Sequence, residues 1–99
     1  MYFALICIDK DESLSLRMKI REQHLEWLRP QEEAGTVVFG GPFLDDAGTM
    51  NGSLLVINVA DKAEAEAFAE GDPYAKAGLF RSTDIKPWKW VAGRTADKQ

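Results

Sequence analysis

The stretch Gly52-Ser53-Leu54-Leu55-Val56-Ile57-Asn58-Val59 predicts a β-strand that is apolar on both of its faces. A strand with one face toward water alternates apolar and polar side chains, whereas a strand covered on both sides reads as a continuous apolar run. The central residues of this stretch are all Leu, Val or Ile. We therefore expect a sheet that has packing partners on both of its faces.

The segments around this strand give an alternating order of strands and helices. Apolar, β-forming residues predict further strands, and apolar residues that recur every three or four positions predict a long helix before the strand. Glycine and proline mark the ends of elements, so Gly40-Gly41-Pro42 is expected to close the second strand. In chain order the expected elements are strands over residues 2–8, 36–39, 52–59 and 80–91, helices over 13–34 and 62–70, a loop over 43–51 and a helical turn over 73–77.

The order βαββαβ indicates the α+β class and a ferredoxin-like fold, in which two helices lie on one face of a four-stranded antiparallel sheet. Pro87 interrupts the last strand and points to an edge position or a bulge. The two helices cover one face only. A second subunit that presses its own sheet against the other face is the simplest cover, so we expect a homodimer; the loops of a monomer are the alternative.

The expected helices carry capping residues at their ends. Asp61 and Glu64 have the spacing of a capping box. Asp72 followed by Pro73 is typical of a new N-cap with proline at the first helical position. Pro30 should kink or loosen the last turn of the long helix, because proline removes one backbone hydrogen bond.

Length and composition limit the classes of function. The 99 residues are expected to form one domain over residues 1–92 and a polar, frayed tail over residues 93–99. The net charge of -4 argues against a nucleic-acid or anionic-membrane surface, and no run of about 20 apolar residues is present to span a bilayer. The first residues lack a basic signal region and Cys7 is the single cysteine, so we expect no internal disulfide and a cytoplasmic location.

No metal or cofactor is expected. One histidine and one cysteine argue against a zinc site of the Cys/His type. Asp45-Asp46 is expected to form a solvated turn rather than a carboxylate metal site. Gly40-Gly41-Pro42 lacks the spacing of a phosphate-binding loop, and its alternatives are close strand packing or a pocket wall with accessible backbone amides.

His24 is the first candidate for proton-transfer chemistry, because imidazole can take up and release a proton near neutral pH. The alternative is a hydrogen-bonded structural histidine. Asp72 could orient the ring while it caps a helix, with one carboxylate oxygen accepting backbone amides and the other accepting the imidazole N–H. The residues that share the apolar face of the long helix are Leu16, Ile20, His24, Trp27, Leu28 and Gln31.

A few other side chains carry chemistry of their own. Cys7 is expected to be an inert buried thiol in the first strand. The hydroxyl groups of Ser53 and Tyr74 could line a pocket or could serve as structural hydrogen-bonding groups. The three tryptophans are expected to pack in the core and at an interface rather than to stack on nucleic-acid bases.

An ordered set of short motifs resembles the YciI-like family of small bacterial proteins over residues 2–91. The resemblance implies a ferredoxin-like fold that dimerises into an α/β barrel, and a His–Asp pair in a cleft. Carried over by matching segments, that pair is His24 and Asp72. The motifs are Arg21-Glu22-Gln23-His24-Leu25, Gly41-Pro42, Gly52-Ser53, Asp72-Pro73-Tyr74 with Ala77-Gly78, and Ile85-Lys86-Pro87-Trp88.

The resemblance also implies a reaction class. One branch of the family resembles dehydrochlorinases of chlorinated aromatic breakdown, and the wider barrel superfamily includes muconolactone isomerases. We therefore expect an enzyme that needs no cofactor, in which His24 is a general base, Asp72 orients it, and Gly41, Pro42, Ser53 and Tyr74 contact the ligand. The substrate would be a small cyclic carbonyl or chloroaromatic-derived compound, and the reaction an elimination or isomerisation.

Two alternatives to an enzyme stay open at this point. Such barrels are also attached to other proteins, so the domain could bind a small molecule without turning it over. It could also be a purely structural dimer with a capped helix and a satisfied core histidine. The segment around residues 43–46 is shorter than in some relatives, so a relative's substrate is not transferred to this chain.

Overall fold

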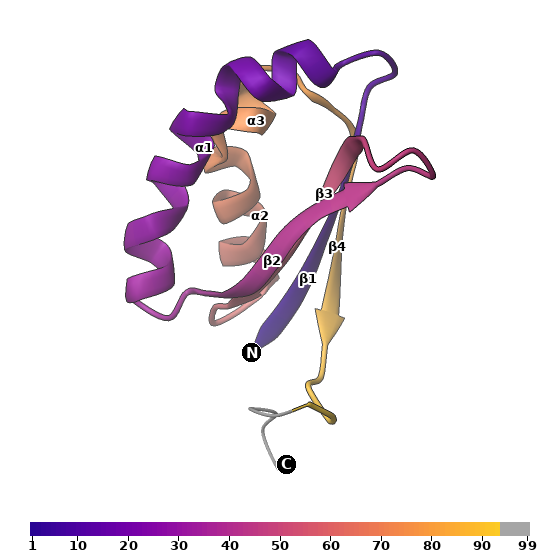
Figure 1. Cartoon of the computed structure of the whole chain (residues 1–99). Helices are drawn as coiled ribbons and strands as arrows, with labels where there is room; N and C mark the ends of the chain where they lie inside the picture. The colour runs from indigo at the N-terminus through magenta and orange to yellow at the C-terminus, as the bar shows by residue number, and fades with distance from the viewer. Residues whose placement is uncertain (94–99) are drawn as a thin grey trace.

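The computed structural model describes residues 1–93, and the expected residues 94–99 of the tail lie outside the described part. Figure 1 shows three helices gathered on one side of a single sheet. This arrangement confirms the α+β, ferredoxin-like order predicted from the sequence. The elements are β1 (Tyr2–Asp9), α1 (Leu14–Glu33), β2 (Val37–Leu44), β3 (Met50–Asn58), α2 (Lys62–Gly71), α3 (Pro73–Lys76) and β4 (Phe80–Trp88).

The sheet has the strand order β2-β3-β1-β4, and each neighbouring pair is antiparallel. β3 and β1 therefore form the centre of the sheet. In this register Leu5 of β1 lies opposite Leu55 of β3 on one side and Ile85 of β4 on the other. Pro87 lies in β4, which is an edge strand. This position agrees with the prediction, because proline has no N–H to donate to a second neighbouring strand.

The main core lies between the helices and the central strands. Phe3 and Leu5 of β1 and Ile57 of β3 are 1% exposed or less, and Leu28 of α1 and Ala65 of α2 pack against the same cluster. Removal of this apolar surface from water is the main driving force of folding, at about 25 cal/mol per Å². The core holds α1 against the β2–β3 side of the sheet, and this packing positions the candidate site.

The opposite face of the sheet is covered in part by aromatic side chains of the same chain. Val56 of β3 is only 2% exposed, although it points away from Leu55 and Ile57. The prediction that β3 is covered on both faces therefore holds at Val56, whereas Leu54 on the same face is only partly buried. The rings that pack on one another there belong to Tyr2, Phe39, Trp88 and Trp90.

The prediction that Gly40-Gly41-Pro42 closes the second strand is wrong. β2 continues to Leu44, and Gly41 and Pro42 pair with Leu54 and Ser53 of β3. β2 is an edge strand and therefore tolerates a proline, which lacks an N–H. Glycine is needed at position 40, because a Cβ there would lie 2.5 Å from Cδ2 of Leu55.

Other element boundaries also differ from the prediction. β3 begins at Met50, so the hairpin loop is shorter than expected, and Asp45 Oδ1 accepts the backbone N–H groups of Ala47 and Thr49 within it. β4 ends at Trp88 rather than at residue 91. Pro30 lies inside α1, which continues to Glu33. Among residues 1–93, none of the helices has the length and apolar character needed to cross a membrane.

Candidate active site

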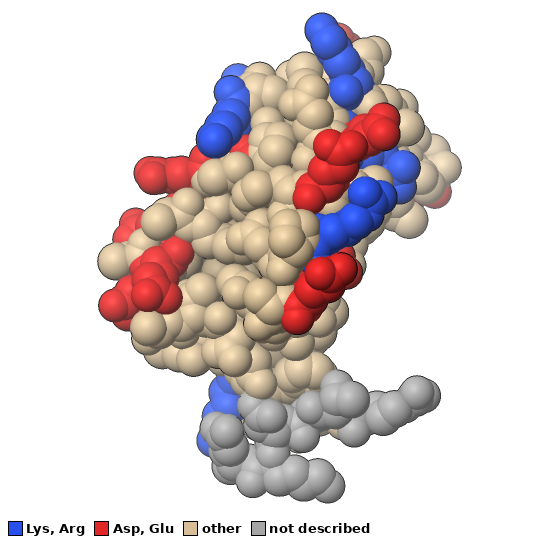
Figure 2. All heavy atoms as spheres, turned by 90° about the vertical axis from the view of Figure 1, so that its left-hand side faces the viewer, with Lys and Arg blue, Asp and Glu red and all other residues tan. Residues whose placement is uncertain are grey.

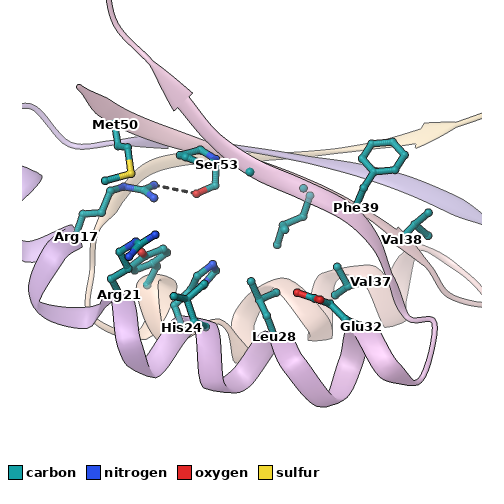
Figure 3. A pocket seen from close by; sticks show the side chains of 16 residues that line it. Arg17, Arg21, His24, Leu28, Glu32, Val37, Val38, Phe39, Met50 and Ser53 are labelled. Atoms are coloured by element: carbon teal, nitrogen blue, oxygen red, sulfur yellow. Dashed lines mark hydrogen bonds between the residues drawn. The ribbon is translucent and has the colours of Figure 1, made fainter. Parts of the chain in front are cut away.

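A pocket of about 550 Å³ lies between α1 and the strands β2 and β3. Figure 3 shows the helix on one side of this pocket and the strands on the other, with side chains from both projecting into it. Apolar side chains form much of the wall, and several polar side chains gather toward the beginning of α1. The lining residues are Arg17, Arg21, His24, Leu25, Leu28, Glu32, residues 37–42, Met50, Ser53, Leu55 and Tyr74.

His24 of α1 is held by a buried carboxylate. Its Nδ1 lies 2.8 Å from Oδ1 of Asp72, and the two side chains are 8% and 4% exposed. Asp72 does not line the pocket, whereas His24 does. A ring nitrogen bonded to a carboxylate carries the proton in the neutral imidazole, so Nε2 keeps its lone pair. His24 therefore has the arrangement of an oriented general base at a pocket wall.

The helix start at α3 places the carboxylate. Asp72 is the N-cap of α3, and its Oδ1 accepts the backbone N–H of Tyr74 at 2.9 Å. The sequence predicted this cap but assigned the two tasks to different oxygens. In the structure the same oxygen, Oδ1, accepts the amide and contacts the imidazole. The ring of Tyr74 then stacks on His24, with centroids 4.1 Å apart and an angle of 17°.

A second buried ion pair lies beside this dyad. Arg17 donates from Nε and Nη2 to the two carboxylate oxygens of Asp9, at 2.7 and 2.9 Å, and from Nη2 to Oγ of Ser53 at 2.9 Å. Burial opposes the charge on Arg17, but the hydrogen bond and the charge of Asp9 outweigh it and raise the pKa of the guanidinium. Arg17 is therefore a permanent cation at the pocket wall.

Tyr74 links the two ion pairs. The Cζ atom of Arg17 lies 4.6 Å from the centre of the Tyr74 ring, which stacks on His24. Burial raises the pKa of the Tyr74 hydroxyl, and the positive charges of Arg17 and Arg21 only partly oppose this effect. Tyr74 thus stays protonated near neutral pH and offers a neutral hydroxyl.

The structure brings the candidate residues from the sequence to one place. His24 and Asp72 are in contact, and Gly41, Pro42, Ser53 and Tyr74 all line the pocket. Sequence reasoning missed the functional potential of Arg17, Arg21 and Asp9. A usable signal was present, since Arg17, Arg21 and His24 follow the i, i+4, i+7 spacing of one helical face.

Cys7 takes no part in the pocket. It is 3% exposed in β1, and burial raises the pKa of its thiol to about 11. A protonated, buried thiol is a poor nucleophile and a poor metal ligand. Across residues 1–93, the His, Cys, Asp and Glu side chains form no group of three that could hold a metal ion.

Comparison with known proteins places this geometry in a family. The YCII-related domain matches residues 1–89. The chain belongs to this family. Protein YciI from Escherichia coli O6:H1 is 30% identical over 97 residues, which cover 92% of this chain and 99% of that protein. The match therefore spans almost the whole of the bacterial relative.

Two further relatives carry more specific names. One is the structure of the 5-chloro-2-hydroxyhydroquinone dehydrochlorinase TftG from Burkholderia phenoliruptrix AC1100, in complex with 2,5-dihydroxybenzoquinone. It is 33% identical with a TM-score of 0.82, covering 98% of this chain and 100% of that one. The other is the derivative of benzaldehyde biosynthesis cluster protein C from Emericella nidulans, 37% identical over 75 residues, or 68% of this chain and 76% of that protein.

Proposed function

We propose that this YCII-related domain is an enzyme that uses His24 as a general base on a small cyclic carbonyl or chloroaromatic-derived substrate. The observation that carries the proposal is the contact of 2.8 Å between His24 Nδ1 and Asp72 Oδ1 at the wall of a pocket. The buried carboxylate fixes the ring and stabilises the imidazolium that forms when Nε2 takes a proton.

The reaction is a proton abstraction next to an activating carbonyl group. Nε2 of His24 takes a proton from the carbon beside the carbonyl, and the bonding electron pair moves into an enolate. In an elimination, chloride then leaves the neighbouring carbon with its bonding pair, so the substrate loses HCl overall. In an isomerisation, the proton returns to a different carbon. Neither course changes the oxidation state of a second reactant.

Of the two reactions, the comparison with TftG supports the elimination. TftG is a dehydrochlorinase, and its structure was solved with a dihydroxybenzoquinone, a planar ring with carbonyl groups. The pocket of this chain has an apolar wall that includes Leu25, Leu28 and Leu55, which suits such a ring. The substrate class that we propose is therefore hydroxylated, chlorinated rings of this kind, which in their diketo tautomer have a carbonyl group, an adjacent CH2 group and a neighbouring saturated carbon that carries chlorine.

Chloride release tests the proposal. Purified protein is incubated without oxygen with 5-chloro-2-hydroxyhydroquinone, and free chloride is followed for the wild type, His24→Gln and Asp72→Asn. General base catalysis contributes about 10²–10⁴-fold, so we expect His24→Gln to lose at least about 100-fold while its fold is retained. Asp72→Asn should lose less, because the amide oxygen can still accept the imidazole N–H.

The same experiment separates the alternatives. Chloride release by His24→Gln at the rate of the wild type would contradict the role of His24. A binding module would be favoured instead if the wild type and both variants bound chlorinated hydroxyquinols saturably and none of them released chloride. Circular dichroism of each variant is the control that checks whether the fold is retained.

We also propose that a second copy of the chain covers the sheet face opposite the helices. Phe39 and Trp88 on that face are 39% and 36% exposed, although they pack on each other. Large apolar side chains of this kind are typical of contact surfaces between subunits. Light scattering at micromolar concentration should give twice the chain mass of 11.0 kDa, and a monomer would contradict this arrangement.

A further inference from the structure

We propose that Arg17, Arg21 and Ser53 form a subsite for a negatively charged oxygen on a planar ring, next to the base. The ligands that fit it are cyclic enolates and hydroxyquinone anions, in which a ring hydroxyl conjugated to a carbonyl behaves as a vinylogous carboxylic acid. This inference rests on the proposed function and names the charge state of its substrate. Neutral rings of the same shape should bind less well.

Arg17 is the fixed cation of the subsite. Its side chain is only 3% exposed, and the two hydrogen bonds that it donates to Asp9 and the one that it donates to Ser53 set its orientation. Nη1 takes part in none of these three bonds, and the side chain of Tyr74 is a further hydrogen-bond partner of the guanidinium. A guanidinium fixed in this way loses little conformational freedom when it binds an anion, which favours affinity.

Arg21 supplies a second positive charge that has no ion-pair partner among the described residues. Asp9 balances Arg17, but Arg21 forms no ion pair within residues 1–93, although it lines the pocket. Figure 3 shows Arg17, Arg21 and His24 extending from α1 toward the strands. The acidic lining residue Glu32 follows His24 by eight positions, which is about 12 Å along a helix.

The pocket therefore presents two guanidinium groups at the end that holds the base and apolar side chains beyond it, whereas the carboxylates of Asp9 and Asp72 do not line it. Two lining cations stand out because the whole chain has a net charge of -4. Figure 2 shows acidic and basic side chains interspersed along the borders of the helical side of the molecule, with uncharged residues between them. When the base takes a proton, the new negative charge develops on the carbonyl oxygen of the same ring, and cations beside His24 would also stabilise that enolate.

A pair of coloured ligands tests the charge preference. 2-Hydroxy-1,4-naphthoquinone is an anion at neutral pH, whereas its methyl ether has the same ring and no charge. Both are titrated by absorbance or calorimetry at constant ionic strength and about pH 7.5. We expect the wild type to bind the anion at least about tenfold more tightly than the ether, because hydrogen bonds to a charged group are among the stronger contacts.

Arg21→Gln should weaken binding of the anion by about three- to tenfold and leave the ether unchanged, and Arg21→Lys should recover part of the loss. Arg29→Gln is the matched control, because Arg29 is an exposed residue of the same helix that does not line the pocket. It removes the same charge and should change neither affinity. Thermal unfolding of each variant is the control that checks whether these substitutions of exposed residues leave the fold intact.

Equal affinity for the anion and the ether would overturn the subsite, as would no measurable binding of the anion at millimolar concentration. An equal loss in Arg21→Gln and Arg29→Gln would also overturn it, because the effect would then come from overall charge. If no chloride is released but anion binding depends on Arg21, the proposed function is wrong and the subsite is supported. If chloride is released but anion binding does not depend on Arg21, only the subsite is wrong.

Discussion

Oδ1 of Asp72 contacts Nδ1 of His24 at 2.8 Å and accepts the backbone N–H of Tyr74 at 2.9 Å. One carboxylate oxygen thus starts helix α3 and orients the imidazole at the pocket wall. The helix cap makes the carboxylate rigid, and the carboxylate in turn fixes the ring. The site is therefore built into the local structure of the chain and needs no separate loop to position it.

Substitution of Asp72 should separate the capping role from the orienting role. Asp72→Ala loses both contacts and should destabilise the fold by about 1–3 kcal/mol, because a cap is removed and the buried imidazole N–H loses its partner. Asp72→Ser keeps a capping oxygen that is too short to reach His24, and should recover about 1 kcal/mol. Urea unfolding measures both values. Equal stability of the Ala and Ser variants would show that Asp72 does not act as a cap.

The Asp9–Arg17 pair should contribute far more to stability than an exposed pair of the same type. Asp9→Asn leaves the buried guanidinium without its counter-charge, which should cost about 3–5 kcal/mol. Asp84→Asn is the control, because Asp84 and Lys86 are about 60% exposed and 3.4 Å apart, and it should cost less than about 1 kcal/mol. Unfolding midpoints that shift equally in the two variants would contradict the importance of this pair.

Gly40 and Gly41 should respond differently to alanine. A Cβ at Gly40 would lie 2.5 Å from Cδ2 of Leu55 and 2.6 Å from the carbonyl oxygen of Leu54, so Gly40→Ala should cost about 2 kcal/mol or more. A Cβ at Gly41 would meet nothing within 4 Å, so Gly41→Ala should keep full stability and affect only ligand binding. Denaturation of the two variants gives the comparison, and equal stability would argue against the register of β2.

The thiol of Cys7 should make the fold sensitive to alkali. Burial raises its pKa from 9.0 to about 11, so the folded chain keeps a proton that the unfolded chain releases. This contribution is complete below pH 9 and is lost as pH rises through about 11, for a total of about 3 kcal/mol. Cys7→Ser removes the titrating group, so its stability should fall less steeply between pH 9 and 11. Parallel curves for the two proteins would contradict the prediction.

The sequence was a good guide where local patterns and tertiary packing agree. The apolar run around Leu55 and Val56 predicted a strand covered on both faces, and the Asp72-Pro73 pair predicted a helix start. It was a poor guide to β2, because Gly40-Gly41-Pro42 looks like a chain break in isolation. Pairing with β3 outweighs that local tendency, and the edge position removes the usual objection to Pro42.

The arginines of the pocket were missed for a different reason. Charged residues on a helix are usually solvent-exposed, so the sequence pattern of α1 did not predict that Arg17 is buried. Its buried position depends on Asp9 and Ser53, which are 8 and 36 positions away in sequence. A contact of that range is set by the fold as a whole. The helical spacing between Arg17 and His24 was visible in the sequence, but the partners of Arg17 were not.

The ¹⁵N NMR spectrum of the neutral imidazole of His24 tests the central claim most directly, and assignment is simple because the chain has one histidine. The account predicts a proton on Nδ1 and a lone pair on Nε2, with the Nε2 signal moving when a hydroxyquinone anion binds. A proton on Nε2 and a bare Nδ1 would contradict it, because His24 would then present a donor to the pocket and could not act there as a base.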